Sequence, residues 1–382
     1  MKRRVVLLTE IISPYRIPLF NALARRPEVS LHVIFLAETD PTLRQWEVYK
    51  HEIEFSYEVL PSWRRRIGRH NLLLNRRVNA ALRKAEPEII VCGGYNYPAS
   101  WQALVWARVH QVPFLLWSES NLQDLRPRSF LIEFLKREFL QACSGFAVPG
   151  KSARAYLRAL HVADDRIFTA PNAVGNDFFS GKAACARQNW ASCRRKLNLP
   201  ERYFLFAGRL VPEKGVFDLL AAYAKLEPQL REQMGLVLAG DGPVRRQLEE
   251  EARSISPGKV CFTGFLQRED LAKCYALGEM LILPTHTDTW GLVVNEAMAC
   301  GLPVILSEMA GCGPDLVKVG WNGFLIPVAD TGRLATVMQS IASQPDLRAT
   351  MGANSTTLIA NYSPEAWAEG LCEAARVFGR GM

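Results

Sequence analysis

The sequence predicts an α/β protein built from two doubly wound, Rossmann-like domains. Short apolar runs, typical of buried parallel strands, alternate with segments of helical period through the first half of the chain. The same alternation begins again at Tyr203, after a stretch without a clear period. Because strands that alternate with helices form a parallel sheet covered on both faces, each half is expected to form one such domain.

The first domain is expected at residues 1–175. Its strands are predicted at residues 5–9, 31–36, 55–60, 88–92, 113–117 and 145–148. Its helices are predicted at residues 17–25, 71–84, 98–110, 129–141 and 152–160. Residues 176–187 lack a clear period and are interpreted as a linker.

The second domain is expected at residues 200–362. Its strands are predicted at residues 203–207, 236–239, 260–263, 280–283, 304–306 and 324–326, with helices between them. A final helix is predicted at residues 364–378. Loops at the carboxyl ends of the strands in such a sheet face the ligand crevice, so polar residues in them are candidates for a binding site.

The composition is that of an ordinary globular protein. Of the 382 residues, 49% are hydrophobic and 22% are charged, and no apolar run approaches the ~18–20 residues of a membrane span. The start of the chain is interpreted as a strand rather than a signal peptide, because Glu10 interrupts the apolar run and no small-residue cleavage site follows. The nine cysteines include no C-x-x-C pair, which favours reduced thiols and a cytoplasmic location.

Residues 280–304 carry the strongest chemical signal. Glu296 lies among apolar residues of a predicted helix, where a lone carboxylate is unfavourable unless it is hydrogen-bonded. Asp288 lies eight residues earlier, in the loop before the helix. The helix start, near Gly291 and Leu292, offers free N–H groups to a phosphate. These features predict a ligand with both hydroxyls and phosphates; the alternative is a Glu296 paired with a structural arginine or a backbone amide.

A second charged loop follows the strand predicted at residues 203–207. Gly208 and Gly215 permit a tight backbone path there. Arg209 and Lys214 place two cations at the carboxyl end of the strand, where an arginine can bind a diphosphate in a bidentate way and a lysine adds a point charge. The alternative is an exposed loop with ordinary surface charges.

Together these features resemble the nucleotide-sugar site of family 4 glycosyltransferases, which have the GT-B fold. The family signature has two glutamates separated by seven residues; here Asp288 and Glu296 have that spacing, and Trp290 takes the place of a usual phenylalanine. Residues 295–304 match the family closely. Asp288 keeps the negative charge of the usual glutamate but is shorter by one methylene. The resemblance implies two domains that face each other across a cleft, with residues 363–382 crossing back to the first domain.

The resemblance also implies roles for individual residues. Those implied in catalysis are Arg209, Lys214, Glu296, Asp288 and Glu119, the last because many relatives place a histidine in its region. Those implied in donor binding are Gly208, Gly240, Gly242, Thr263, Gly264, Phe265, Trp290, Gly291, Leu292, Val293 and Arg16. Arg16 belongs to a Pro-Tyr-Arg-x-Pro pattern of a known subgroup, which would place it at the phosphates or the acceptor; the alternative is a capped helix start with Pro18 in its first turn.

The function that the resemblance implies is transfer of a hexose from a UDP- or GDP-sugar to a hydroxyl of a carbohydrate or lipid-linked acceptor. Transfer would proceed with retention of anomeric configuration, in the assembly of a cell-surface polysaccharide or glycolipid. The nucleoside diphosphate sugar is the donor substrate, no cofactor is expected, and no metal is implied because no Asp-x-Asp occurs near the site. The alternatives are another GT-B activity, such as a sugar-nucleotide epimerase, and a non-catalytic sugar-nucleotide-binding protein. A Rossmann dehydrogenase is disfavoured, because no G-x-G-x-x-G follows the first strand.

The net charge of +8 is concentrated in the first half, notably at residues 63–84. This stretch holds eight basic residues: Arg64, Arg65, Arg66, Arg69, Arg76, Arg77, Arg83 and Lys84. One interpretation is adhesion to an anionic membrane surface, with Trp63, Ile67 and residues 72–74 as apolar partners, which would place the protein at the inner face of the membrane. A solvated face is the alternative. No nucleic-acid partner is expected, because no recognised nucleic-acid motif accompanies the charge.

Overall fold

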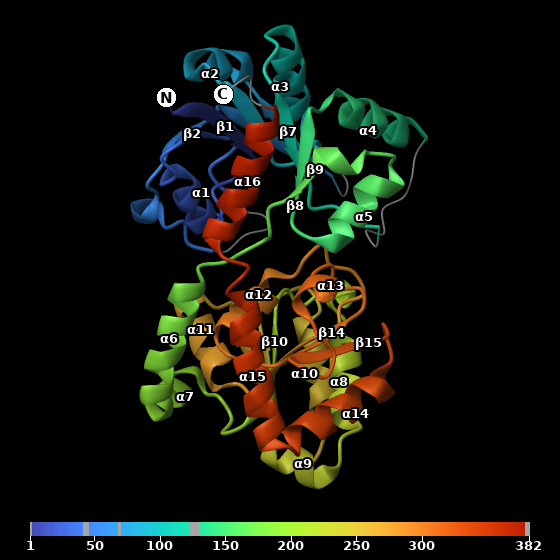
Figure 1. Ribbon diagram of the computed structural model, residues 1–382. Helices are drawn as coiled ribbons and strands as arrows, with labels where there is room; N and C mark the ends of the chain where they lie inside the picture. The colour runs from blue at the N-terminus through green and yellow to red at the C-terminus, as the bar shows by residue number, and fades with distance from the viewer. Residues whose placement is uncertain (1, 41–45, 68–69, 123–129, 379–382) are drawn as a thin grey trace. The chain divides into compact units, whose positions relative to one another are not determined.

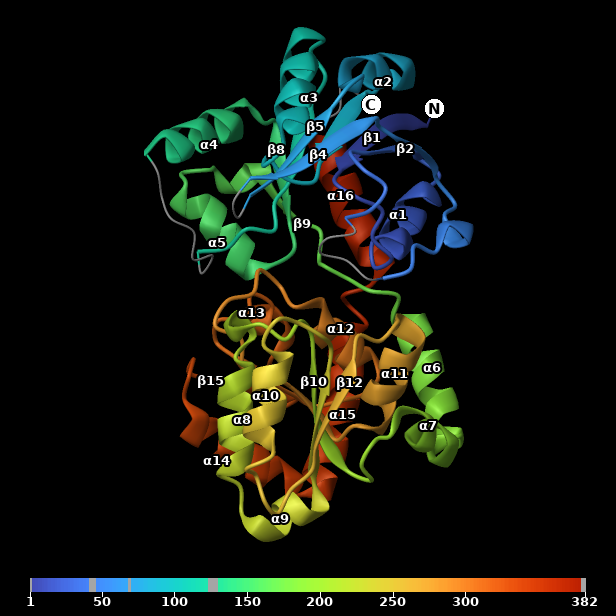
Figure 2. The same ribbon diagram turned by 180° about the vertical axis from the view of Figure 1, so that it is seen from behind.

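The computed structural model describes residues 2–40, 46–67, 70–122 and 130–378. The chain divides into two compact units (Figures 1 and 2). Unit 1 comprises Met1–Leu122, Arg126–Val174 and Ser363–Met382, and unit 2 comprises Gly175–Tyr362. Each unit is built on its own parallel sheet, so the predicted pair of doubly wound, Rossmann-like folds is confirmed.

The described residues of unit 1 form a seven-stranded parallel sheet with the order β3-β2-β1-β6-β7-β8-β9. Its strands are β1 (Arg3–Thr9), β2 (Val29–Phe35), β3 (Ser56–Val59), β6 (Ile89–Cys92), β7 (Phe114–Trp117), β8 (Gly145–Val148) and β9 (Ile167–Thr169). The strand order reverses between β1 and β6. Ligands of such sheets bind beyond the carboxyl ends of the strands at that switch point, which here lies between the loops after β1 and β6.

The sheet of unit 1 separates two apolar cores. Along β1, Val5 and Leu7 belong to one core and Val6 and Leu8 to the other, as the period of two residues requires. The first core is closed by α1 (Ile17–Ala24) and α16 (Pro364–Phe378). The second is closed by α2 (Val78–Ala85), α3 (Pro98–Val109), α4 (Phe130–Ala142) and α5 (Lys151–Ala159).

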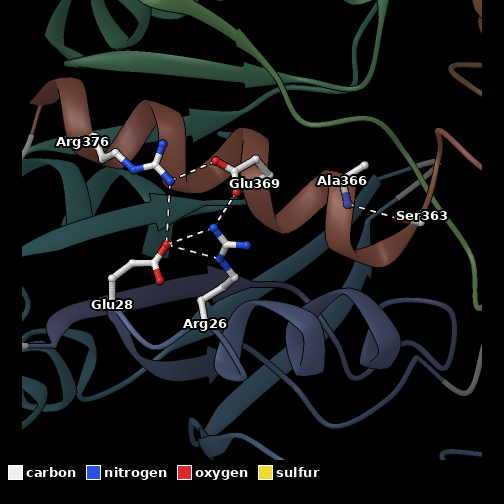
Figure 3. Close-up of polar contacts among 6 residues, drawn as sticks. All are labelled: Arg26, Glu28, Ser363, Ala366, Glu369 and Arg376. Carbon is white, nitrogen blue, oxygen red and sulfur yellow. Dashed lines mark hydrogen bonds and ion pairs between the residues drawn. The ribbon is translucent and has the colours of Figure 1, made fainter.

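Helix α16 lies beside α1 and β9 although it comes last in the chain (Figure 1). The hydroxyl oxygen of Ser363 accepts a hydrogen bond from the backbone N–H of Ala366 at 3.2 Å, which caps the start of the helix (Figure 3). One turn later the side chain of Trp367 is fully buried, with its ring centroid 5.7 Å from that of Phe20 on α1. The apolar face of α16 is therefore part of the core of unit 1.

Ion pairs fix the polar face of α16 to the turn between α1 and β2. Arg26 binds Glu369 at 2.5 Å, and Arg376 lies 3.7 Å from Glu28 (Figure 3). Arg26 also binds Glu28 at 3.1 Å, and Arg376 binds Glu369 at 2.9 Å, so each of the four charged groups has two opposite neighbours. These partly exposed pairs add orientation rather than much stability.

The prediction of a helix at residues 71–84 is wrong for the first part of that range. There β5 (His70–Asn75) forms an antiparallel hairpin with β4 (Ser62–Ile67), and α2 begins only at Val78 (Figure 2). In the hairpin register Arg64 lies opposite Leu73; Leu73 is buried, and Arg64 forms an ion pair with the buried carboxylate of Asp40. An arginine at an inward position breaks the alternation by which a strand is recognised in a sequence.

The described residues of unit 2 form a six-stranded parallel sheet with the order β12-β11-β10-β13-β14-β15. Its strands are β10 (Tyr203–Ala207), β11 (Gly235–Ala239), β12 (Val260–Gly264), β13 (Met280–Leu283), β14 (Val304–Ser307) and β15 (Gly323–Ile326). All six lie within a residue of the predicted ranges. The strand order reverses between β10 and β13, the two strands that precede the charged loops singled out in the sequence.

The helices of unit 2 are α6 (Asn176–Gln188), α7 (Trp190–Leu197), α8 (Val216–Ala224), α9 (Pro228–Gln233), α10 (Arg245–Ala252), α11 (Arg268–Leu277), α12 (Leu292–Ala299), α13 (Gly313–Leu316), α14 (Thr331–Ala342) and α15 (Pro345–Ile359). The interpretation of residues 176–187 as a linker is wrong, because they form α6. Its buried residues Phe179, Ala183 and Ala186 recur at helical spacing, and α6 packs against α11 and α12. Across the described ranges, no helix is both long and apolar enough to cross a membrane.

Candidate functional site

The switch point of unit 2 brings two predicted site residues together. Lys214 follows β10 and Asp288 follows β13, 74 positions apart, yet the Lys214 Nζ lies 2.5 Å from the Asp288 Oδ2. Both side chains are largely buried, with 21% and 14% of their surface exposed. An ion pair that links the two loops holds the ammonium group at the carboxyl end of the sheet, where a diphosphate would need it.

Glycines let the loops of the switch point approach each other closely. Gly215 adopts φ = 67°, and a Cβ built there would lie 1.9 Å from the carbonyl oxygen of Pro284. The loop after β10 therefore packs directly on the end of β13. Any side chain at Gly215 would push the two loops apart and so separate Lys214 from Asp288.

The other predicted glycines line up at the ends of neighbouring strands. A Cβ on Gly240 would lie 1.8 Å from the carbonyl oxygen of Gly208, and one on Gly242 would lie 2.2 Å from that of Leu210. Gly264 forms a bridge with Gly240. These contacts give Gly208, Gly240, Gly242 and Gly264 a packing role in the structure, whatever else they contact.

The loop before α12 is fixed by backbone contacts with the loop after β14. The backbone N–H of Gly311 donates to the carbonyl oxygen of Asp288 at 3.0 Å. The backbone N–H of Cys312 donates to the carbonyl oxygen of Trp290 at 3.2 Å. Trp290, predicted as a donor contact, has a buried indole that donates to the Asn295 Oδ1 at 2.8 Å. The Trp290 ring therefore packs in the protein interior and is hydrogen-bonded to α12 through Asn295.

Helix α12 begins without a side-chain cap. Gly291 precedes it with φ = 97° and has no side chain with which to cap the first turn. Leu292 and Val293, both predicted donor contacts, are the first two helical residues and are half-buried. Their N–H groups fall among the first four of the helix, which have no partner inside it, and the helix dipole favours an anion at this end.

Glu296, one turn further along α12, is held by a residue that the sequence did not indicate. The Tyr275 hydroxyl on α11 donates a hydrogen bond to the Glu296 Oε2 at 2.8 Å. No ion pair joins Glu296 to a described residue, so its neighbour is a phenol rather than the structural arginine of the alternative interpretation. Burial raises the pKa of Glu296 to about 7, and the Tyr275 hydrogen bond lowers that pKa in part. Near neutral pH the carboxyl group is thus poised between its two charge states, and hydroxyl donors from a ligand would favour the ionised one.

The remaining predicted residues of unit 2 lie at the surface or near it. Arg209 is exposed, and its guanidinium makes no hydrogen bond or ion pair with the residues that the structure describes. Thr263 donates from its hydroxyl to the carbonyl oxygen of Gly264 at 2.9 Å, and 39% of Phe265 is exposed. In the described ranges, no group of three or more His, Cys, Asp or Glu residues could hold a metal ion.

Unit 1 contains a second pair of predicted residues. Arg16 follows β1 and Glu119 follows β7, and the Arg16 Nη2 donates to the Glu119 Oε1 at 2.6 Å. The other terminal nitrogen of Arg16 donates to the Asn172 Oδ1 at 2.9 Å. The Arg16 guanidinium also lies 4.2 Å from the ring centroid of Trp117, a distance typical of a cation–π contact. Arg16 is therefore held within unit 1 by the side chains of Glu119, Asn172 and Trp117.

Comparison with known families identifies both parts of the chain. Residues 19–178 match the family described as Glycosyltransferase Family 4, and residues 192–358 match the family described as Glycosyl transferases group 1. Curated relatives include the alpha-D-kanosaminyltransferase of Streptomyces kanamyceticus, 32% identical over 48% of this chain and 50% of that protein. Another is the D-inositol 3-phosphate glycosyltransferase of Rhodococcus jostii, 33% identical over 49% of this chain and 43% of that protein. The chain thus spans half or less of the length of these two relatives.

Solved structures resemble the whole chain. HepE of Anabaena, in complex with UDP and glucose, is 18% identical, covers 98% of this chain and 99% of its own, and has a TM-score of 0.75. WaaG, a glycosyltransferase involved in lipopolysaccharide biosynthesis, is 16% identical, covers 99% of this chain and 100% of its own, and has a TM-score of 0.68. At these identities the likeness concerns the fold, and it confirms the GT-B architecture expected from the sequence.

Proposed function

This chain belongs to the family 4 (group 1) glycosyltransferases, and from that premise we propose that it moves a hexosyl group from a nucleoside diphosphate sugar to an acceptor hydroxyl, with retention of anomeric configuration. The observation that carries the proposal is the meeting of Lys214 and Asp288 at the switch point of unit 2. Beside them α12 presents an uncapped start and, one turn on, the half-buried Glu296. Cations, helix N–H groups and a carboxylate suit a ligand with a diphosphate and vicinal hydroxyls.

In the proposed reaction, the bond between the anomeric carbon and the diphosphate breaks, and negative charge develops on the leaving phosphate. The acceptor oxygen forms the new bond to that carbon, and its proton passes to the leaving phosphate. Arg209, Lys214 and the start of α12 neutralise that charge, and preorganised groups of this kind are usually the largest single contribution to catalysis. Glu296 accepts hydrogen bonds from ribose hydroxyls. Asp288 orients Lys214 through their ion pair and contacts the transferred sugar.

The proposal is tested by screening UDP- and GDP-sugars for their effect on thermal unfolding. A donor present at 100 times its dissociation constant raises the free energy of unfolding by about 2.7 kcal/mol. The stabilising donor is then incubated with carbohydrate and lipid-linked acceptors, and NMR of the product gives its anomeric configuration. Product with the donor's configuration supports the proposal. Release of an epimerised sugar nucleotide without transfer would favour the epimerase alternative.

Transfer is expected to persist at its full rate in excess EDTA. The diphosphate charge is met by Arg209, Lys214 and the N–H groups of α12, which are part of the protein and cannot be chelated. The measurement is the initial rate of transfer before and after dialysis against EDTA, with Mg²⁺ restored in a parallel sample as the control. A rate that disappears with the chelator and returns with Mg²⁺ contradicts this assignment of the charges.

We also propose that the hairpin β4–β5 docks the enzyme on an anionic membrane surface, where it would meet a lipid-linked acceptor. Trp63 and Leu74 lie directly opposite each other in the hairpin and are exposed by 52% and 40%. Arg65, Arg76 and Arg77 are exposed beside them. Apolar side chains flanked by arginines suit the boundary between headgroups and acyl chains, and each basic residue near such a surface adds about 1 kcal/mol.

The hairpin also limits which of the eight basic residues can take part. Arg64 is turned inward to Asp40, so it serves the fold rather than the docking surface. Arg69 lies outside the described residues, as does the side chain of Arg66. Arg83 and Lys84, at the end of α2, are exposed. This leaves the exposed face of the hairpin and the residues just after it to be tested.

Sedimentation with lipid vesicles tests the docking surface. Wild-type protein is expected to pellet with vesicles that contain phosphatidylserine and to remain in solution with purely zwitterionic ones. Replacing Arg65 and Arg76 with glutamate should lower partitioning at least about tenfold, since two basic contacts of about 1 kcal/mol each are lost and reversed. Arg246→Glu, which reverses an exposed arginine of unit 2, is the matched control and should change nothing. Equal pelleting of all three proteins would leave the hairpin as an ordinary solvated surface.

A further inference from the structure

Resting on the proposed function, we infer that Trp117 and Trp367 are positioning residues for transfer. They belong to a row of side-chain contacts, called the stack below, that begins on the C-terminal helix α16 and ends on the Arg16–Glu119 ion pair. The two indole rings in it are tilted by 59° rather than parallel. Trp367 and Trp117 have ring centroids 5.1 Å apart, and the Arg16 guanidinium lies 4.2 Å from the ring centroid of Trp117. Arg16 then binds the Glu119 carboxylate at 2.6 Å. Each member of the stack thus contacts the next one.

The far end of the stack is open to a ligand. Glu119 uses its Oε1 for Arg16, while its Oε2 makes no hydrogen bond with a residue in the described ranges. About a third of the Glu119 side chain is exposed, whereas Arg16 is 12% exposed. Glu119 is therefore the member of the pair that a sugar or acceptor hydroxyl can reach, and Arg16 is the group that fixes its direction.

Trp117 and Trp367 are both buried, and neither indole N–H has a hydrogen-bond partner among the described residues. An unpaired indole N–H also occurs at Trp106 on α3, but at Trp117 a cation lies over the ring as well. A buried donor without a partner is unfavourable, and phenylalanine would fill much of the same space without one. Tryptophan, however, has the ring that attracts a cation most strongly. Its presence at position 117 is accounted for if the ring face is there to hold Arg16.

The near end of the stack is fixed by the placement of α16. Trp367 lies in the first turn after the Ser363 cap, and its backbone N–H donates to the Ser363 carbonyl oxygen at 3.1 Å. Further along, Glu369 binds Arg26 at 2.5 Å (Figure 3). These contacts set both the position and the rotation of α16 in unit 1. The last helix of the chain therefore sets where Arg16 and Glu119 lie.

The experiment is a double-mutant cycle on the rate of transfer, with Trp117→Phe, Arg16→Lys and both together. Trp117→Phe keeps an aromatic ring but weakens the attraction for Arg16, and we expect kcat to fall about tenfold with the donor KM within twofold. In the Arg16→Lys background, Trp117→Phe should have less than a twofold further effect, because the group through which it acts is already displaced. Trp367→Leu should lower kcat in the same direction.

The matched control is Phe55→Leu. Phe55 is buried in the same core and contacts Phe20, with ring centroids 5.6 Å apart, but it is not part of the stack. It should lower the melting temperature and leave kcat within twofold of wild type. The inference is overturned if Trp117→Phe changes only the melting temperature, or if the effects of Trp117→Phe and Arg16→Lys on kcat multiply.

Failure of the proposed function would look different. Wild-type protein would then turn over no nucleotide sugar, and the positioning role would fall with the activity. The same four proteins would still show by thermal unfolding whether Trp117 and Arg16 are coupled. Loss of positioning alone is recognised by an active wild type whose kcat is insensitive to Trp117→Phe.

Discussion

Glu296→Gln is expected to lower kcat/KM for the nucleotide-sugar donor by about 10²–10³-fold, the usual loss for one preorganised charged contact in an active site. Glutamine keeps the size of the side chain and can still accept the hydrogen bond from Tyr275, which joins the carboxylate at 2.8 Å in the wild type. Glutamine lacks the negative charge that would strengthen hydrogen bonds from the ribose hydroxyls. The loss should therefore appear in donor affinity and rate, with the fold intact.

The same substitution is expected to stabilise the ligand-free protein at alkaline pH. Burial raises the pKa of Glu296 to about 7 from its usual 4.5, so the folded state holds the proton more tightly than the unfolded state. Stability then falls as the pH rises between these two values, and the penalty is complete above about pH 7. At roughly 1.4 kcal/mol per pKa unit, it amounts to at most about 3.5 kcal/mol. Glutamine does not ionise and escapes this penalty.

Both effects can be measured on one set of proteins. Unfolding free energies at pH 5 and pH 8 should show Glu296→Gln gaining on the wild type as the pH rises, while donor turnover is nearly lost. Glu250→Gln, on the exposed surface of α10, is the control and should change neither quantity by much. Wild-type turnover by Glu296→Gln would remove this residue from the site.

Lys214→Ala is the second substitution with a large expected effect. It removes a cation from the diphosphate and, with it, the 2.5 Å ion pair that orients Asp288, so two proposed contacts fail together. We expect kcat/KM to fall by at least about 10²–10³-fold. The measurement is steady-state transfer at saturating acceptor, with donor affinity determined separately by calorimetry.

Its matched control is Lys196→Ala. Lys196 also pairs with an aspartate of unit 2, Asp270 at 3.3 Å, but it lies on the exposed surface, where an ion pair adds little stability. Activity should be unchanged in this variant. If the two alanine substitutions reduce activity equally, the effect of Lys214 is one of general stability and the phosphate contact is not supported.

Twelve of the thirteen strands in the two parallel sheets were predictable because such strands are short and apolar; β9, only three residues long, lies outside every predicted range. The hairpin β4–β5 was not, because its inward position is occupied by Arg64, whose charge is met by Asp40, well away in the sequence. Helix α6 carried a readable signal in Phe179, Ala183 and Ala186, which recur at helical spacing, but the many small and polar residues around them weakened it.

The candidate site shows the same division. Lys214 and Asp288 follow adjacent strands at a switch point, so a rule about parallel sheets is enough to bring them together. Glu296 stood out as a carboxylate among apolar residues, but its partner Tyr275 sits on another helix and looks like an ordinary core aromatic in the sequence. Side-chain pairs between helices depend on packing details that a local pattern does not contain.

In the proposed site, the ionised Glu296 carboxylate accepts hydrogen bonds from hydroxyls of the nucleotide-sugar donor, and proton release on binding tests this role most directly. Near pH 7 the carboxyl is partly protonated in the free protein, so donor binding should release up to about half a proton. Calorimetric titrations of a nucleoside diphosphate sugar, whose esterified phosphates do not titrate near neutral pH, would be run in two buffers of different ionisation enthalpy. Wild-type protein should release protons on donor binding, and Glu296→Gln should release none. Equal release by both proteins, or binding without any release, would contradict this role of Glu296.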